Sequence, residues 1–104
     1  MKPARFLDEA DYEMRIQALA YELKRPGLGQ RFIARIERTV AFLREYPRAG
    51  APLSRSPYRK MNVLGLPFRL VYAVTTKRIW IVAVAHHSRR FRYWRDRRLP
   101  DDKD

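Results

Sequence analysis

Two adjacent histidines, His86 and His87, follow the most apolar segment of the chain and precede a run of arginines. Imidazole titrates near neutral pH, so a histidine can accept or supply a proton, and a guanidinium group can hold a phosphate through paired hydrogen bonds. Cleavage of RNA by attack of a ribose 2′-hydroxyl needs such a base, such an acid, and cations around the phosphorus. The side chains that suit these tasks are His86, His87, Arg59, Arg69, Arg89 and Tyr93.

The histidine pair has a second interpretation. Successive side chains of an extended segment point to opposite faces, so at most one of His86 and His87 faces such a site, and the other packs or is solvated. Two adjacent histidines without a third ligand at useful spacing do not define a metal site. The sequence therefore predicts no metal and no cofactor.

The segment "RRFRYWRDRR", residues 89–98, interleaves arginines with three aromatic side chains. Tyr93 and Trp94 with their neighbours can stack on bases while the arginines neutralise phosphates, as in proteins that bind single strands. Alternatively, Phe91 and Trp94 pack back on the sheet while the arginines stay solvated. Both interpretations are open at this point.

The composition is strongly basic, because 23 lysines and arginines stand against 11 acidic residues and give a net charge of +12. Such an excess attracts polyanions, so it favours a nucleic acid, an anionic membrane surface or an acidic protein as the partner. The chain has no cysteine, which excludes a disulfide framework and thiolate chemistry and fits the cytoplasm. Its longest apolar run, residues 79–85, is far shorter than the roughly 20 residues that span a bilayer, and we expect no membrane or targeting segment.

Two amphipathic helices are predicted in the first half of the chain. The first runs from about Glu9 to Lys24, and its apolar side chains repeat at helical spacing at Ile16, Leu19, Ala20 and Leu23. The second runs from about Leu28 to Tyr46, with an apolar stripe at Ile33, Ile36, Val40 and Leu43. Between them, "RPGLGQ" ends one helix and permits a tight reversal. The two stripes predict an antiparallel helical hairpin whose apolar faces meet the core.

Strands are predicted in the second half. Residues 47–57, "PRAGAPLSRSP", contain three prolines and a glycine and indicate a loop. The segments "YRKMNVL", "FRLVYAV" and "IWIVAVA" are rich in β-branched and aromatic residues. The polar turn "TTKR" joins the last two as an antiparallel hairpin, and residues 3–7 add an edge strand.

These elements predict one α+β domain over residues 1–104. The N-terminal helical hairpin, about 9–46, packs on one face of a small antiparallel β-sheet, about 58–87, and a basic C-terminal arm, 88–104, follows. The opposite face of the sheet, lined by Arg59, Arg69 and the C-terminal residues, is then free to meet a partner.

The order of these motifs resembles the RelE/ParE superfamily of bacterial toxins. The resemblance rests on the helical hairpin with its glycine-rich turn, "LPFRLVYAV", a polar turn, "IWIVAVAHHSRR" and "YWRDR", and it covers nearly the whole chain. It implies a RelE/ParE-like fold. It also implies the function of a toxin in a type II toxin-antitoxin system, of the kind associated with plasmid stabilization, that arrests growth.

The resemblance leaves two mechanisms open. RelE-like members are metal-independent endoribonucleases that cut messenger RNA in the ribosomal A site, and a match to YoeB-like ribonucleases makes Arg69 a phosphate-binding arginine and His87 a general acid or base. ParE-like members inhibit DNA gyrase, and "VAHHSRR" matches their pattern at His86 and Arg89. The chain continues for 16 residues beyond Ser88, which favours the ParE-like mechanism. A basic nucleic-acid-binding module without toxicity is a third hypothesis.

The resemblance also implies the partners. A cognate acidic antitoxin would cover the toxin with a segment that folds on binding. Its DNA-binding half would repress the operon, so operator DNA is contacted only through the antitoxin. The target is then DNA gyrase or the ribosome with its messenger RNA, and no membrane is involved.

Overall fold

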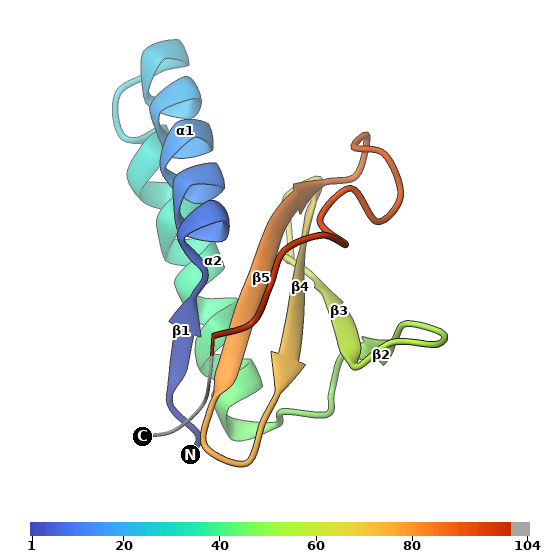
Figure 1. Cartoon of the computed structure of the whole chain (residues 1–104). Coiled ribbons are helices and arrows are strands. Elements are labelled where there is room, and N and C mark those ends of the chain that lie inside the picture. The colour runs from blue at the N-terminus through green and yellow to red at the C-terminus, as the bar shows by residue number, and fades with distance from the viewer. Residues whose placement is uncertain (101–104) are drawn as a thin grey trace.

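The computed structural model describes residues 1–100, which form two helices and five strands. In chain order these are β1 (Ala4–Phe6), α1 (Asp8–Lys24), α2 (Leu28–Glu45), β2 (Ala51–Pro52), β3 (Tyr58–Asn62), β4 (Phe68–Val74) and β5 (Ile79–His86). Figure 1 shows the two helices beside the sheet and the C-terminal arm crossing in front of β5. The predicted α+β architecture is confirmed. None of the helices in the described residues has the length and apolarity of a membrane-spanning segment.

The turn between the helices is fixed by a carboxylate. Glu22, in the last turn of α1, accepts hydrogen bonds from the backbone N–H groups of Gly27 and Gly29, each at 3.0 Å. A negative charge is favourable at a helix N-terminus, because the first backbone N–H groups there have no partner within the helix. The hairpin is therefore closed by a side chain as well as by the flexible "RPGLGQ" segment.

Helix α2 buries the stripe that its sequence predicts. Ile36 and Leu43 are fully buried, and Ile33 and Val40 are partly buried against the same core. Phe32 joins them and packs edge-on against Phe68 of β4, with ring centroids 5.1 Å apart.

Helix α1 does not bury its predicted stripe, and that expectation is wrong. The exposed fractions of Ile16, Leu19 and Leu23 are 43%, 56% and 80%. Instead α1 buries Ala10 and Ala18, because small side chains let the helix lie close to its neighbours. At Gly29 of α2 an added Cβ would come within 2.6 Å of the Ala18 carbonyl oxygen, so this approach requires glycine.

The sheet has the order β1-β5-β4-β3-β2. The pairs from β2 to β5 are antiparallel, as predicted, but β1 pairs in parallel with β5, so the sheet is mixed. The direction of a three-residue strand is not encoded in its own side chains. The predicted loop 47–57 contains the short strand β2, whose Pro52 is tolerated because β2 lies at the edge of the sheet.

The two faces of the sheet meet different parts of the chain. Phe68 packs against α2, so alternation along β4 places Leu70 and Tyr72 on this helix face as well. Arg69 and Val71 therefore lie on the opposite face, which we call the arm face because the C-terminal arm, residues 88–100, covers it.

Candidate functional site

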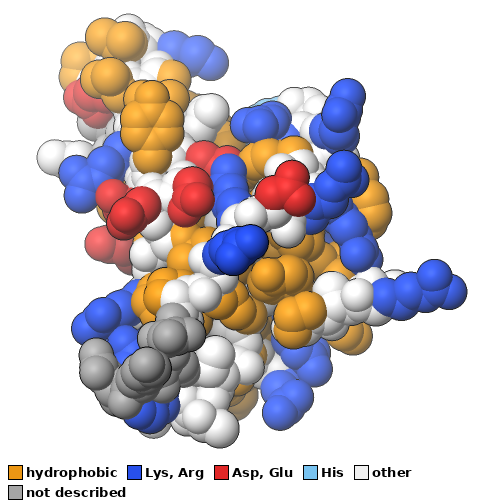
Figure 2. Space-filling view, viewed as in Figure 1, with side chains coloured by type: hydrophobic (Ala, Val, Ile, Leu, Met, Phe, Trp, Pro, Cys, Tyr) orange, Lys and Arg blue, Asp and Glu red, His pale blue; other side chains and the backbone are white. Residues whose placement is uncertain are grey.

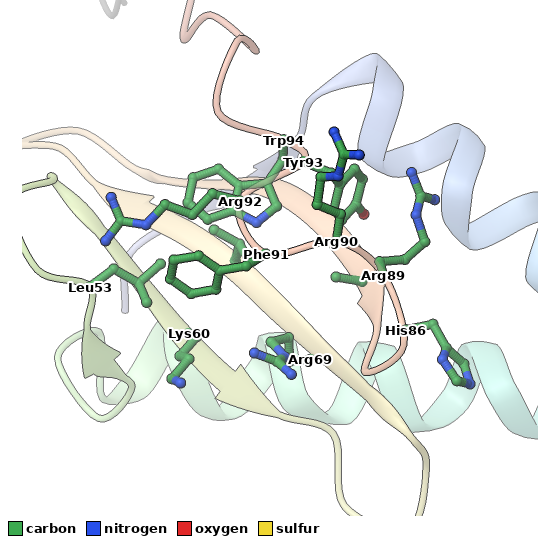
Figure 3. A pocket seen from close by; sticks show the side chains of 12 residues that line it. Leu53, Lys60, Arg69, His86, Arg89, Arg90, Phe91, Arg92, Tyr93 and Trp94 are labelled. Atoms are coloured by element: carbon green, nitrogen blue, oxygen red, sulfur yellow. The ribbon is translucent and has the colours of Figure 1, made fainter.

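A narrow cleft lies between the arm and the arm face of the sheet (Figure 3). Its enclosed volume is about 30 Å³, which is room for about two water molecules. The lining residues are Leu53, Lys60, Arg69, Val71, Ala85, His86, Arg89, Arg90, Phe91, Arg92, Tyr93 and Trp94. Five of them are lysine or arginine, and none of the described residues that line the cleft is acidic. The cleft is therefore suited to an anion.

Arg69 stands on the sheet side of the cleft. It projects from β4, where its backbone neighbours are Asn62 of β3 and Ala85 of β5. The Nε atom of Arg69 is buried and has no hydrogen-bond partner. A buried donor without a partner costs free energy unless water or a ligand oxygen reaches it. Arg69 is thus a donor available to a small oxyanion.

The arm is anchored to α1 through one carboxylate. Glu13 accepts hydrogen bonds from the Tyr93 hydroxyl at 2.6 Å and from both terminal nitrogens of Arg97 at 2.9 and 2.8 Å. The same carboxylate accepts the backbone N–H of Val84 at 3.0 Å, and Arg97 donates to the carbonyl oxygen of Val82 at 2.9 Å. Strand β1 reaches only the first residues of β5. The Glu13–Arg97 pair therefore satisfies the edge of β5 that β1 leaves uncovered.

The protonation of this anchor is well defined. Burial raises the pKa of Tyr93 well above its ordinary value, and the hydrogen bond to Glu13 raises it further. The hydrogen bond to Glu13 raises the pKa of Arg97, against the opposing effect of burial. Tyr93 is therefore a neutral donor and Arg97 a cation at neutral pH.

A second set of contacts holds the middle of the arm. Trp94 is buried and packs edge-on against Tyr58 of β3, with ring centroids 5.1 Å apart. Arg92 donates from Nη2 to the carbonyl oxygen of Ser54 at 2.7 Å. Phe91, in contrast, is 67% exposed. Of the two aromatic residues expected to pack on the sheet, only Trp94 does so.

Five of the predicted site residues line this one cleft, namely Arg69, His86, Arg89, Tyr93 and Trp94. Arg89 places its guanidinium over the ring of Tyr93, 3.9 Å from the centroid. His87 lies outside the set that lines the cleft and is exposed on the turn after β5.

Arg59 does not reach the cleft, and its predicted place on this face is wrong. Arg59 pairs across the strands with Tyr72, which points to the helix face. Its guanidinium donates to the carbonyl oxygens of Arg48 and Gly50 at 3.1 and 2.8 Å. Gly50 itself donates to the Tyr72 hydroxyl, and a Cβ at this position would come within 2.6 Å of that oxygen. Arg59 therefore holds the chain that follows α2.

His86 has a defined local arrangement. Its Nδ1 accepts the backbone N–H of Ser88 at 3.0 Å, so the proton of the neutral ring lies on Nε2. The ring packs edge-on against Phe68 at 5.0 Å, and Figure 3 shows it turned away from Arg69. Within residues 1–100, no group of three or more histidine, cysteine or acidic side chains is placed to hold a metal ion.

Sequence reasoning missed several residues of this site. Strand alternation could have identified Lys60. Neighbouring residues of a strand point to opposite faces, so Lys60 faces the same side as Arg69 when Arg59 faces the helices. Phe91, Arg90 and Arg92 belong to the segment already recognised as basic and aromatic, but its sequence does not say which side chains face the cleft. Glu13 gave no signal, because its partners are remote along the chain.

A second surface lies on α1, where Tyr12 and Ile16 lie beside His86 and Arg89. We call it the α1 stripe, and it consists of Tyr12, Ile16, Leu19 and Leu23, with exposed fractions from 43% to 80%. Figure 2 shows exposed hydrophobic side chains over the upper part of α1, acidic side chains below them, and basic side chains over the arm. Apolar side chains spaced along one helix and left in solvent indicate a protein-binding surface.

Comparison with known proteins agrees with this architecture. A chain titled "Chromosomal ParDE TA system from P. aeruginosa" has a similar fold, with a TM-score of 0.73 and 19% sequence identity over 83% of this chain and 96% of that chain. The two helices and mixed sheet are thus those of a RelE/ParE superfamily toxin. Residues 5–91 match the model of the ParE toxin of the type II toxin-antitoxin system, parDE, and the chain belongs to this family. A comparison with curated protein sequences gives no match.

Proposed function

We propose that this protein arrests growth by inhibiting DNA gyrase and is neutralised by a cognate acidic antitoxin. The observation that carries the proposal is the match of residues 5–91 to the ParE toxin family. The resemblance of "VAHHSRR" and of the longer tail to gyrase-inhibiting toxins supports gyrase as the target.

The α1 stripe supports the antitoxin part of the proposal. It offers a row of apolar side chains at the spacing that an amphipathic partner helix needs. The net charge of +12 favours an acidic partner, whose segment would fold as it covers this surface. Contact with operator DNA is then made by the antitoxin.

The ribonuclease alternative has less support. It assigns catalysis to His87 together with Arg69, but only Arg69 lines the cleft, while His87 is exposed on the following turn. A general acid or base must come within hydrogen-bonding reach of the atom it protonates or deprotonates.

Purified gyrase and relaxed plasmid test the target. We expect the protein to prevent supercoiling and to leave cellular transcripts intact when it is expressed without its antitoxin. Normal supercoiling together with A-site cuts in messenger RNA, absent in His87→Ala and Arg69→Ala, would instead establish the ribonuclease. Growth without arrest would leave the non-toxic module as the correct hypothesis.

A charge placed in the α1 stripe tests the antitoxin surface. Leu19→Glu should weaken antitoxin binding at least tenfold, because it puts a carboxylate in an apolar contact with an acidic partner. Leu64→Glu is the matched control, since Leu64 is 85% exposed in the turn between β3 and β4. Equal binding by the two variants in calorimetry would show that the antitoxin lies elsewhere.

A further inference from the structure

We propose that the arm and the arm face of the sheet bind single-stranded nucleic acid, with Phe91 stacking on a base and the surrounding cations holding the phosphates. This activity goes beyond inhibition of gyrase and does not depend on it. Most of the arm also extends beyond the family match, which ends at residue 91.

The arm concentrates positive charge, most of which forms no ion pair within residues 1–100. Residues 89–98 contain six arginines and one acidic residue, Asp96. Within residues 1–100, Arg97 is the only one of these arginines that forms an ion pair. Lys60 and Arg69 add two further cations from the sheet on the other side of the cleft. A cationic surface of this kind attracts the phosphate backbone of a nucleic acid.

Phe91 supplies an aromatic ring on which a base can stack, and cationic side chains surround it. It is 67% exposed, and the guanidinium of Arg92 lies over its ring, 5.2 Å from the centroid. Figure 3 shows the Phe91 ring on the side of the arm that faces Lys60 and Arg69. An aromatic ring in reach of several cations fits an unpaired base with its flanking phosphates, because every base has a face that can stack. The bases of a duplex are already stacked on one another, so the ring favours a single strand.

The backbone around Phe91 is held in one shape. Arg92 has φ of +56°, a left-handed conformation that is unfavourable for residues other than glycine. Its guanidinium bonds the Ser54 carbonyl oxygen, and Trp94 fixes the next turn against Tyr58. Strained conformations of this kind cluster at functional sites. A fixed arm also loses little freedom on binding, so its cations contribute more to affinity.

Fluorescence anisotropy with labelled oligothymidylate, oligouridylate, a DNA duplex and polyglutamate tests the proposal on the full chain. We expect a single strand to bind more tightly than the duplex, and the two oligonucleotides to show whether DNA or RNA is preferred. The logarithm of the binding constant should fall with the logarithm of salt concentration with a slope of about −3, as for about four phosphate contacts. Polyglutamate should bind weakly, because it offers charge without bases.

Single substitutions separate stacking from charge. Phe91→Ala should weaken oligonucleotide binding roughly tenfold, and Phe91→Trp should restore it, because base stacking needs an aromatic face. Lys60→Ala should reduce the size of the salt slope by about 0.7. Phe42→Ala and Lys77→Ala are the matched controls, since both side chains are exposed outside the cleft, and they should bind like the original protein.

Three results would overturn the proposal. They are binding of the duplex at least as tight as that of the single strand, equal binding of polyglutamate, and no difference between Phe91→Ala and Phe42→Ala. Each would show that the arm is an unspecific basic surface. Gyrase inhibition is measured in a separate assay. Failure of nucleic-acid binding and failure of gyrase inhibition are therefore distinguishable.

Discussion

The two helices carry similar numbers of apolar side chains but use them in opposite ways. Helix α2 buries large ones, including Phe32, Ile36 and Leu43, in the core. Helix α1 buries alanines, uses the Glu13 carboxylate to hold β5 and the arm, and leaves the α1 stripe in solvent. The comparison shows that α2 contributes large side chains to the core, while α1 combines a structural role with an exposed apolar surface.

The largest expected effect is a difference in the free energy of unfolding between alanine substitutions of two isoleucines, one on each helix. Ile36 of α2 is fully buried, whereas Ile16 of α1 is 43% exposed. Ile36→Ala should lower the free energy of unfolding by about 4 kcal/mol, because it leaves a cavity. Ile16→Ala should change it by less than about 0.5 kcal/mol. Urea denaturation measures both, and similar losses would erase the distinction between the helices.

Loss of the Glu13–Arg97 pair, which attaches the arm to α1, should give the next largest effect on stability. Glu13→Gln leaves Arg97 without its carboxylate in a place where both side chains are mostly buried. We expect a loss of about 3 kcal/mol in the free energy of unfolding and faster tryptic cleavage in the arm. Glu37→Gln is the control, because Glu37 is an exposed carboxylate on α2. If the arm resists trypsin equally in both variants, Glu13 does not anchor it.

A larger side chain at position 18 tests the close packing of α1 against α2. Ala18→Leu should cost about 2 kcal/mol, because the buried alanine lies against Gly29 with no room for a longer side chain. Ala20→Leu places the same group at an exposed position of α1 and should be neutral within about 0.5 kcal/mol. Thermal unfolding of the pair decides whether small side chains are required at position 18.

The smallest effect concerns pH. Because the folded state raises the pKa of Tyr93, it keeps a proton that the unfolded chain loses above about pH 10. This contribution is complete below about pH 10 and is lost as the pH rises further. By about pH 11 the original protein should lose about 1 kcal/mol more stability than Tyr93→Phe does. Parallel alkaline curves for the two proteins would contradict this assignment.

The sequence predicts most of the elements but not the face that α1 buries. Helical periodicity locates both helices, and β-branched residues locate three strands. Periodicity weights large apolar side chains, so it selects Ile16, Leu19 and Leu23 of α1 rather than the alanines that the close approach requires. The direction of β1 and the existence of β2 depend on pairing with other strands, which no local pattern encodes.

The sequence also predicts only part of the candidate site. Arg69 and the basic arm follow from strand pattern and charge. The prediction for Arg59 is wrong because Arg59 and Lys60 are both basic, so the composition of β3 does not show which of the two points to the helices. Glu13 could not be found, since its role depends on Tyr93 and Arg97, which only the folded chain brings near.

The parallel pairing of β1 with β5 joins the first strand of the fold to the last one. During synthesis, residues 4–6 therefore have no strand partner until residues 79–81 have emerged from the ribosome. The arm follows β5 in the chain, so its contacts with Glu13 of α1 cannot form before residues 93–97 have been made. A chain that is still being made therefore lacks both the closed edge of the sheet and the attached arm.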